Sequence, residues 1–256
     1  MTGTAAPRYH PTVRPVEDVA LVLDARPFRE RHLLLAVLAP AHGVVRGILR
    51  NARGRRTARR AAAAQLLSRV RARWHQRPAA DLATFEELEI ERSSFPLARE
   101  VERAAAAAVV AEALLAFCPE GEAAPRHFGL GTGLLEALLG EAPPRAAIAY
   151  ALYWVLRLGG VLPEPWRCTA CGAAVDAEAR IAPGDAHPRC AACAPPGSRR
   201  LGPAAIRWLA AARRTPPAEL AGDPPREALE WLERLVRIEA HRPLPALDVW
   251  HRLSRP

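Results

Sequence analysis

Four of the five cysteines in this chain form two pairs of matched spacing, and this arrangement restricts the possible fold more than any other feature. The pairs are Cys168-Thr-Ala-Cys171 and Cys190-Ala-Ala-Cys193, which together read C-x2-C-x18-C-x2-C. Each pair is expected on a tight turn, where two thiolates can converge on one ion, and four sulfurs complete a tetrahedron. Four sulfur ligands leave no open position for a reactive water. The pattern therefore predicts one structural zinc ion held by Cys168, Cys171, Cys190 and Cys193.

Two other interpretations of the cysteines exist, namely a redox-active pair and chance thiols, and the two matched pairs favour a metal over both. Gly172 follows the first pair and would let the backbone turn sharply beneath the ion. His187 is close enough in sequence to be considered as a substitute ligand, although an ordinary loop histidine is the simpler interpretation. Cys118 has no neighbouring cysteine and is interpreted as a partly buried thiol.

Positive charge is concentrated in one N-terminal segment. Residues 46–60 read RGILRNARGRRTARR, with seven arginines and no acid. Residues 31–80 hold twelve arginines and no Asp or Glu, and because the whole chain is +9, the other 206 residues sum to 24 − 27 = −3. A solvated face usually mixes both signs, so the segment predicts a polyanion-binding surface, with nucleic acid as the expected ligand. A disordered basic tail, or the compositional drift of an arginine-rich genome, is the alternative.

The composition also excludes several classes of protein. All 36 basic residues are arginine, since the chain contains no lysine. A Walker A loop, a Schiff-base enzyme and a lysine-adenylating ligase all require a lysine, so none can operate here in its usual form. No stretch approaches the roughly 20 apolar residues that cross a bilayer. The opening MTGTAAPRYHP lacks the apolar core of a signal peptide, so we expect a cytoplasmic, nucleoid-associated protein without a membrane partner.

The first ninety residues predict a small antiparallel barrel. Strands are expected over 19–25, 32–39 and 44–51, followed by a loop RGRRTARR, a fourth strand near 70–74 and a fifth over 82–91. The fourth strand alternates apolar and basic side chains, which places one set inward and the other outward. The inward set is Val70, Ala72 and Trp74, and the outward set is Arg69, Arg71 and Arg73. Five short strands without intervening helices are typical of a barrel.

After Pro96 the pattern becomes helical. Apolar residues recur at helical spacing in 96–117, 127–140, 143–160, 202–214 and 225–240. The cysteine module interrupts this series, so it is expected as an insertion within a helical domain. The predicted domains are therefore a barrel over 1–92, a helical domain made of 93–163 and 201–256, and a zinc-binding insertion over 164–200. The fold class is α+β and multidomain.

No constellation of catalytic residues is present. The GLGTG at 129–133 lacks the spacing of a phosphate loop, and glycines at a helix start explain it better. No serine lies in a G-x-S-x-G context. A cluster of four acids could serve a metal-dependent nuclease, but a solvated strand face that balances the arginines is the favoured interpretation. These acids are Glu86, Glu87, Glu89 and Glu91.

Several segments, in this order along nearly the whole chain, resemble the RecO family of DNA repair and recombination mediators. VALVLDARPFRERHLLLAVLAPAHGVVRGILRNAR resembles the opening of the family, with Phe28-Arg29-Glu30 in the first turn and Gly43 in the second. LRLGGVLPEPWRCTACG is similar to the helix that leads into the first cysteine pair, and LGPAAIRWLAA to the helix after the second pair. IEAHRPLPALDVWHRL is similar to the end of the C-terminal helix. The chain departs from the family at residues 50–53, where Arg-Asn-Ala-Arg replaces a region that commonly contains glycine.

The resemblance implies an oligonucleotide-binding (OB) barrel, a helical bundle and a zinc-binding insertion, with a role that is not catalytic. It implies binding to single- and double-stranded DNA, annealing of complementary strands, and assistance in loading recombinase onto DNA covered by single-stranded DNA-binding protein. The implied partners are RecR and that single-stranded DNA-binding protein, whose acidic tail would bind the helical domain.

We expect ten arginines of the barrel to contact phosphates without reading bases, because phosphate contacts carry no sequence information. These arginines are Arg46, Arg50, Arg53, Arg55, Arg56, Arg59, Arg60, Arg69, Arg71 and Arg73. The alternative function is a zinc-ribbon transcription or RNA-binding factor, which would prefer one sequence over scrambled DNA, or RNA over DNA.

Overall fold

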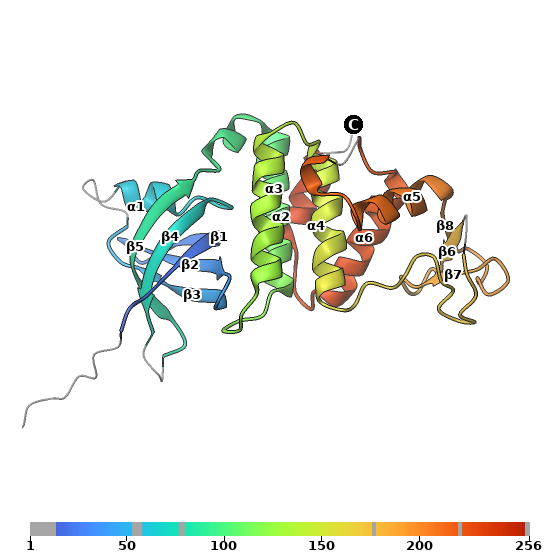
Figure 1. The fold of residues 1–256 in the computed structure, drawn as a ribbon, viewed down its shortest axis with the longest axis horizontal. Helices are drawn as coiled ribbons and strands as arrows, with labels where there is room; N and C mark the ends of the chain where they lie inside the picture. Colours follow the sequence, from blue (N-terminus) through green and yellow to red (C-terminus); the bar gives the residue numbers. More distant parts are fainter. Residues whose placement is uncertain (1–13, 53–57, 77–79, 176–177, 220–221, 254–256) are drawn as a thin grey trace, which may run out of the picture.

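The structure is a computed structural model that describes residues 14–52, 58–76, 80–175, 178–219 and 222–253, and for Ala58 and Arg59 the backbone alone. Figure 1 shows three parts in a row: a barrel at the N-terminal end, a layer of helices in the middle, and a small sheet with long loops at the far end. This arrangement confirms the predicted α+β class. Within the described part of the chain, no helix combines the length and the apolar character needed to cross a membrane.

Five strands close the N-terminal barrel in the order β1-β2-β3-β5-β4, as expected for an OB-like fold. The strands are β1 (Val16–Phe28), β2 (His32–Ala39), β3 (Gly43–Leu49), β4 (Arg69–His75) and β5 (Ala83–Arg92). All neighbours are antiparallel except β3 and β5. Period-two alternation in β4 puts Trp74 inside, where it is 3% exposed and packs on Phe85 at 6.1 Å between ring centroids. The predicted inward phase of β4 is confirmed.

The helical part is assembled from chain segments on both sides of the cysteine module. Before the module come η2 (Phe95–Arg99), α2 (Val101–Phe117), α3 (Pro125–Leu139) and α4 (Pro144–Leu158). After the module come α5 (Pro203–Ala212), η3 (Pro217–Glu219), α6 (Arg226–Glu239) and α7 (Pro245–Leu253). Helix α2 packs against α3, α4 and α7, and its many alanines allow close approach. The module itself contains the three-stranded sheet of β6 (Ala179–Ile181), β7 (Pro188–Arg189) and β8 (Arg199–Leu201).

Two local predictions were wrong. The loop expected for RGRRTARR gives way at Ala58 to a short helix, α1 (Ala58–Ala63), because alanine and arginine are both strong helix formers. The glycines of GLGTG do not start a helix but lie inside α3. A Cβ atom added at Gly131 would lie 2.6 Å from Leu21 Cδ1 and 2.9 Å from Leu114 Cδ1. The glycine therefore permits α3 to lie close to both β1 and α2.

The barrel is joined to the helices at the turn between β2 and β3. The Val44 N–H donates to the carbonyl of Pro119 at 2.9 Å, and the Ala124 N–H donates to the carbonyl of Pro40 at 2.8 Å. Gly43, with φ +62°, lies at the centre of this contact with the loop between α2 and α3. Backbone hydrogen bonds in both directions thus connect the β2–β3 turn to the α2–α3 loop.

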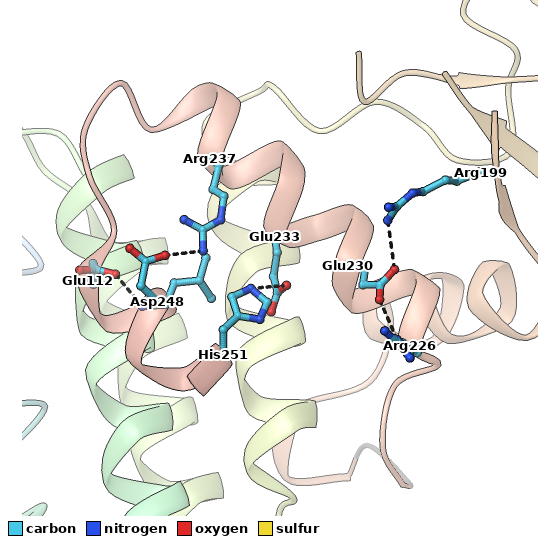
Figure 2. Close-up of polar contacts among 9 residues, drawn as sticks. Glu112, Arg199, Arg226, Glu230, Glu233, Arg237, Asp248 and His251 are labelled. Carbon is cyan, nitrogen blue, oxygen red and sulfur yellow. Dashed lines mark hydrogen bonds and ion pairs between the residues drawn. The ribbon is translucent and has the colours of Figure 1, made fainter. Parts of the chain in front are cut away.

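The final helix is attached to the bundle by side chains from α2 and α6 (Figure 2). The Glu112 carboxylate on α2 accepts the N–H groups of Ala246 at 3.0 Å and Leu247 at 3.2 Å, in the first turn of α7. These N–H groups have no partner within their own helix, so a carboxylate there stabilises the helix start. Burial raises the pKa of Glu112, and the two N–H donors oppose that effect.

Replacing Glu112 with alanine should destabilise the protein by about 2 kcal/mol, because two partly buried N–H donors would lose their acceptor. Denaturant unfolding measures the loss of stability. Hydrogen exchange at the Ala246 and Leu247 N–H groups should become faster. Glu102, an exposed acid on the same helix, provides the control, since its replacement by alanine should leave exchange in α7 unchanged. Equal effects of the two substitutions would show that Glu112 does not hold α7.

Candidate nucleic-acid interface and metal centre

The four paired cysteines converge at one point. Their Sγ atoms all lie within 4.8 Å of one another, and those of Cys171 and Cys190 are 3.9 Å apart. Four sulfurs bound to one zinc at about 2.3 Å would be about 3.8 Å apart at the corners of a tetrahedron. The spacing therefore fits a single metal ion with four thiolate ligands.

Backbone turns position each pair. The Gly172 N–H donates to the Cys168 carbonyl at 2.9 Å, and Gly172 has φ +73°, a conformation that favours glycine. The second turn is closed by the N–H groups of Cys193 and Ala194, which both donate to the Cys190 carbonyl. The N–H and hydroxyl of Thr169 donate to the Pro188 carbonyl at 2.9 and 3.0 Å and so hold the first turn next to the strand before Cys190.

The pKa values of two of the thiols are shifted in opposite directions. Backbone N–H groups, that of Cys190 first, lower the pKa of Cys168 to about 6. Hydrogen bonds to the neighbouring thiols, that of Cys190 first, raise the pKa of Cys193 to about 12. Sulfurs this close repel one another as thiolates, and a bound cation removes that repulsion. The cluster can therefore hold a metal ion, and four cysteines in this arrangement are consistent with zinc binding.

Neither His187, which was considered as a substitute ligand, nor the fifth cysteine, Cys118, belongs to this cluster. His187 is exposed, and its N–H donates to Asp185 at 3.0 Å. Cys118 is buried at the end of α2, and burial raises the pKa of its thiol to about 12. Among the described residues, the four-cysteine group is the single cluster with metal-ligating geometry.

The outward arginines of β4 form a row on the surface of the barrel, but each faces an acid. Arg69 and Arg71 pair with Glu91 at 3.4 and 2.8 Å. Arg73 pairs with Glu86 at 3.1 Å. The expectation that the acids of β5 balance these arginines is confirmed for Glu86 and Glu91. Glu17 also lies 3.8 Å from Arg71, so three acids face the three arginines and the β4 row carries little net positive charge.

Arg46 is also paired, whereas Arg50 is not. Arg46 on β3 binds Glu120 of the α2–α3 loop at 2.8 Å, which connects the barrel to the helices. Arg50 follows β3, is exposed, and pairs with no acid among the described residues. Arg60 is half-buried in α1. Arg53, Arg55 and Arg56 lie outside the described residues, as does the side chain of Arg59.

Two further arginines reach the same end of the barrel as Arg50. Arg29 and Arg31 are exposed in the turn between β1 and β2, and neither pairs with an acid in the described part of the chain. A hydrogen bond of 3.0 Å from the Asn51 N–H to His32 Nδ1 joins this turn to the end of β3. Arg29 also lies over the Phe28 ring at 5.3 Å from its centroid. Sequence reasoning did not count Arg29 and Arg31 as site residues, although Arg31 begins the acid-free segment.

Comparison with known proteins agrees with this architecture. The family model described as Recombination protein O N terminal matches residues 13–94, and the model described as Recombination protein O C terminal matches residues 98–248. These ranges cover the barrel and nearly all of the helical part with its insertion.

Three relatives named DNA repair protein RecO show the same likeness over long stretches. The protein of Koribacter versatilis (strain Ellin345) is 30% identical over 172 residues, covering 65% of this chain and 68% of the relative. That of Anaeromyxobacter sp. (strain Fw109-5) is 31% identical over 196 residues, covering 74% and 76%. That of Anaeromyxobacter dehalogenans (strain 2CP-C) is 30% identical over 226 residues, covering 84% and 88%. Because two family models together span both parts of the fold, this chain belongs to the RecO family of DNA repair proteins.

Proposed function

We propose that this protein is a recombination mediator that binds single- and double-stranded DNA without strict sequence preference and anneals complementary strands. It also assists the loading of recombinase onto DNA covered by single-stranded DNA-binding protein. The observation that carries the proposal is the group of exposed arginines without acidic partners, among the described residues, at one end of the barrel: Arg29, Arg31 and Arg50. The acid-free segment 46–60 continues from this point.

The arrangement suits phosphate binding. Arginine forms a planar fork that binds phosphate through two N–H groups and can stack on bases, so it serves single and double strands alike. Such contacts position DNA without reading its sequence. A surface that neutralises two strands lowers their mutual repulsion, which favours annealing without a nucleotide cofactor.

The ten predicted arginines should not contribute equally to the affinity for DNA. Exposed ion pairs stabilise a protein by only about 0–1 kcal/mol, so a phosphate can displace Glu86 or Glu91 from β4. The displaced carboxylates nevertheless remain nearby and repel the DNA. Arg50 has no such competing acid among the described residues, and the sequence from 46 to 60 contains none. We therefore assign the larger share of the affinity to the segment that begins at Arg50.

Two triple variants of equal charge test this assignment. Replacing Arg50, Arg53 and Arg55 with alanine should weaken single-strand binding and reduce the salt dependence by about 2 log units per log unit of salt, at ~0.7 for each lost phosphate contact. Replacing Arg69, Arg71 and Arg73 should reduce the single-strand affinity and its salt dependence by a smaller amount. Fluorescence anisotropy over a salt series measures the affinity and the salt dependence of each variant. A larger loss for the β4 variant would overturn the assignment.

Annealing of complementary strands precoated with single-stranded DNA-binding protein, without nucleotide, tests the function itself. Faster annealing that declines with salt is expected, and the Arg50/Arg53/Arg55 variant should lose it. Tight DNA binding without annealing would contradict the mediator role. A preference for RNA, or for one DNA sequence, would favour a zinc-ribbon transcription or RNA-binding factor instead.

The remaining parts of the proposal follow from family membership. Zinc would be the ion held by Cys168, Cys171, Cys190 and Cys193, and with four sulfur ligands its role would be structural. RecR and single-stranded DNA-binding protein would be the protein partners. The role would not be catalytic, in keeping with the engagement of Glu86 and Glu91 by arginines.

A further inference from the structure

The small sheet of the cysteine module has two very different faces. Ala179, Ile181 and Leu201 are buried on one face. Arg199, directly opposite Ile181 on the neighbouring strand, shares that face and reaches Glu230 of α6 at 3.5 Å (Figure 2). The indole N–H of Trp231 on α6 donates to the Ala186 carbonyl at 2.7 Å, so this face is attached to the helices.

The outer face carries one arginine from each of its three strands, in a single row. Arg180 on β6 is directly opposite Arg189 on β7 and Arg200 on β8. Residues directly opposite each other in a sheet point to the same face, and like charges in such positions are destabilising. The Arg180 and Arg200 side chains are 44% and 68% exposed, and that of Arg189 is 30% exposed. A solvated face has no structural need for such a row.

The row is only partly neutralised. Glu178 pairs with both Arg180, at 3.3 Å, and Arg200. Asp185 pairs with Arg189 at 2.8 Å. Two carboxylates thus face three guanidinium groups, and exposed pairs of this kind are weak enough for a phosphate to replace them.

We propose that Arg180, Arg189 and Arg200 form a second DNA-binding surface, which contacts the phosphate backbone of a single strand. The three neighbouring strands span about 10 Å at ~4.8 Å per step, so the three arginines can contact successive phosphates of one strand. The module lies at the opposite end of the helical layer from the barrel (Figure 1). One molecule can therefore hold one strand at the barrel and another at the module. This inference rests on the proposed DNA binding by the barrel and extends it.

An assay that measures the capture of a second strand distinguishes DNA binding by the module from DNA binding by the barrel. The protein is bound to an immobilised single strand, unbound protein is removed, and a labelled strand that is not complementary to the first is added. The Arg180→Ala/Arg200→Ala variant should capture about tenfold less of the labelled strand at low salt, while its affinity for the first strand changes by less than about twofold. Glu178→Gln should increase capture, because it releases both arginines.

Two control variants show whether a loss of capture is specific to the arginines of the module sheet. Arg207 and Arg214 are exposed arginines on α5 and just after it, and replacing both with alanine removes the same charge but should leave capture unchanged. The Arg180→Lys/Arg200→Lys variant keeps the charge and should retain most of the capture, which also excludes misfolding as the cause.

Equal capture by the Arg180→Ala/Arg200→Ala variant and the Arg207→Ala/Arg214→Ala control would overturn the second surface and leave the barrel proposal intact. If the unmodified protein failed to bind the first strand, the barrel proposal would fail, and this inference would fail with it.

Discussion

Replacing Cys168 with serine should abolish binding of the proposed zinc ion and unfold the module between α4 and α5, while the DNA binding proposed for the barrel is retained. In small zinc domains the binding of the metal supplies about 10–16 kcal/mol, and this is folding free energy. The short strands β6, β7 and β8 form a sheet too small to be stable alone. The module should therefore depend on its ion, whereas the barrel has its own core around Trp74 and Phe85.

Three measurements check this expectation. The metal content of the purified protein should fall, and trypsin should cleave faster at Arg180, Arg199 and Arg200. Anisotropy with a single-stranded oligonucleotide should show unchanged binding. Chelation of the unmodified protein should reproduce the effect of the substitution. Cys118 supplies the control, because this buried thiol lies outside the cluster, and Cys118→Ala should keep the metal. An unchanged metal content in Cys168→Ser would show that the four thiols do not form the site.

Replacing Gly43 with valine should destabilise the protein by about 3–5 kcal/mol and loosen the contact between barrel and helices. A Cβ atom at this position would lie 2.4 Å from the carbonyl oxygens of both Pro119 and Glu122. Both obstacles are backbone atoms, so the α2–α3 loop would have to move as a unit. That movement would lengthen the Val44–Pro119 hydrogen bond of 2.9 Å. The backbone at Gly43, with φ +62°, would also become strained with any side chain.

Gly121 separates the steric clash from the backbone strain, because it lies in the same loop and has φ +73°. No atom of the described residues lies within 4 Å of the point that a Cβ atom would occupy there. Gly121→Ala should cost only the strain of the backbone, about 1 kcal/mol. Denaturant unfolding measures both variants, and hydrogen exchange at Val44 and Ala124 reports on the contact itself. If the two substitutions had equal cost, the contact at Gly43 would not be what joins the two parts.

Structural features that depend on short-range sequence patterns were predictable from the sequence. Period two in 69–75 placed Trp74 inside the barrel and the arginines outside, because alternate side chains of a strand must face opposite ways. The cysteine spacing predicted that four sulfurs would converge at one point, because two tight turns suffice to bring them together. The helical spacing identified α2 to α6 within a few residues at each end.

Features that depend on contacts between distant segments were not predictable. The GLGTG glycines inside α3 were misassigned because a glycine pattern does not reveal which neighbour approaches it. The helix at Ala58 is a different case, because its alanines and arginines favour a helix locally and the prediction of a loop there was a local error. Arg46 is neutralised by Glu120, a residue 74 positions away. No local signal distinguishes that paired arginine from Arg50, which pairs with no acid among the described residues.

By itself, the sequence determined the family, the two kinds of secondary structure and the four cysteines that converge, since each of these depends on residue type and short-range spacing. Only the tertiary structure decided which arginines keep an uncompensated charge and which residues join the barrel to the helices. It also aligned Arg180, Arg189 and Arg200 in one row. The physical reason is that electrostatic and steric interactions depend on distance in space, and chain folding brings together charges that are far apart in sequence.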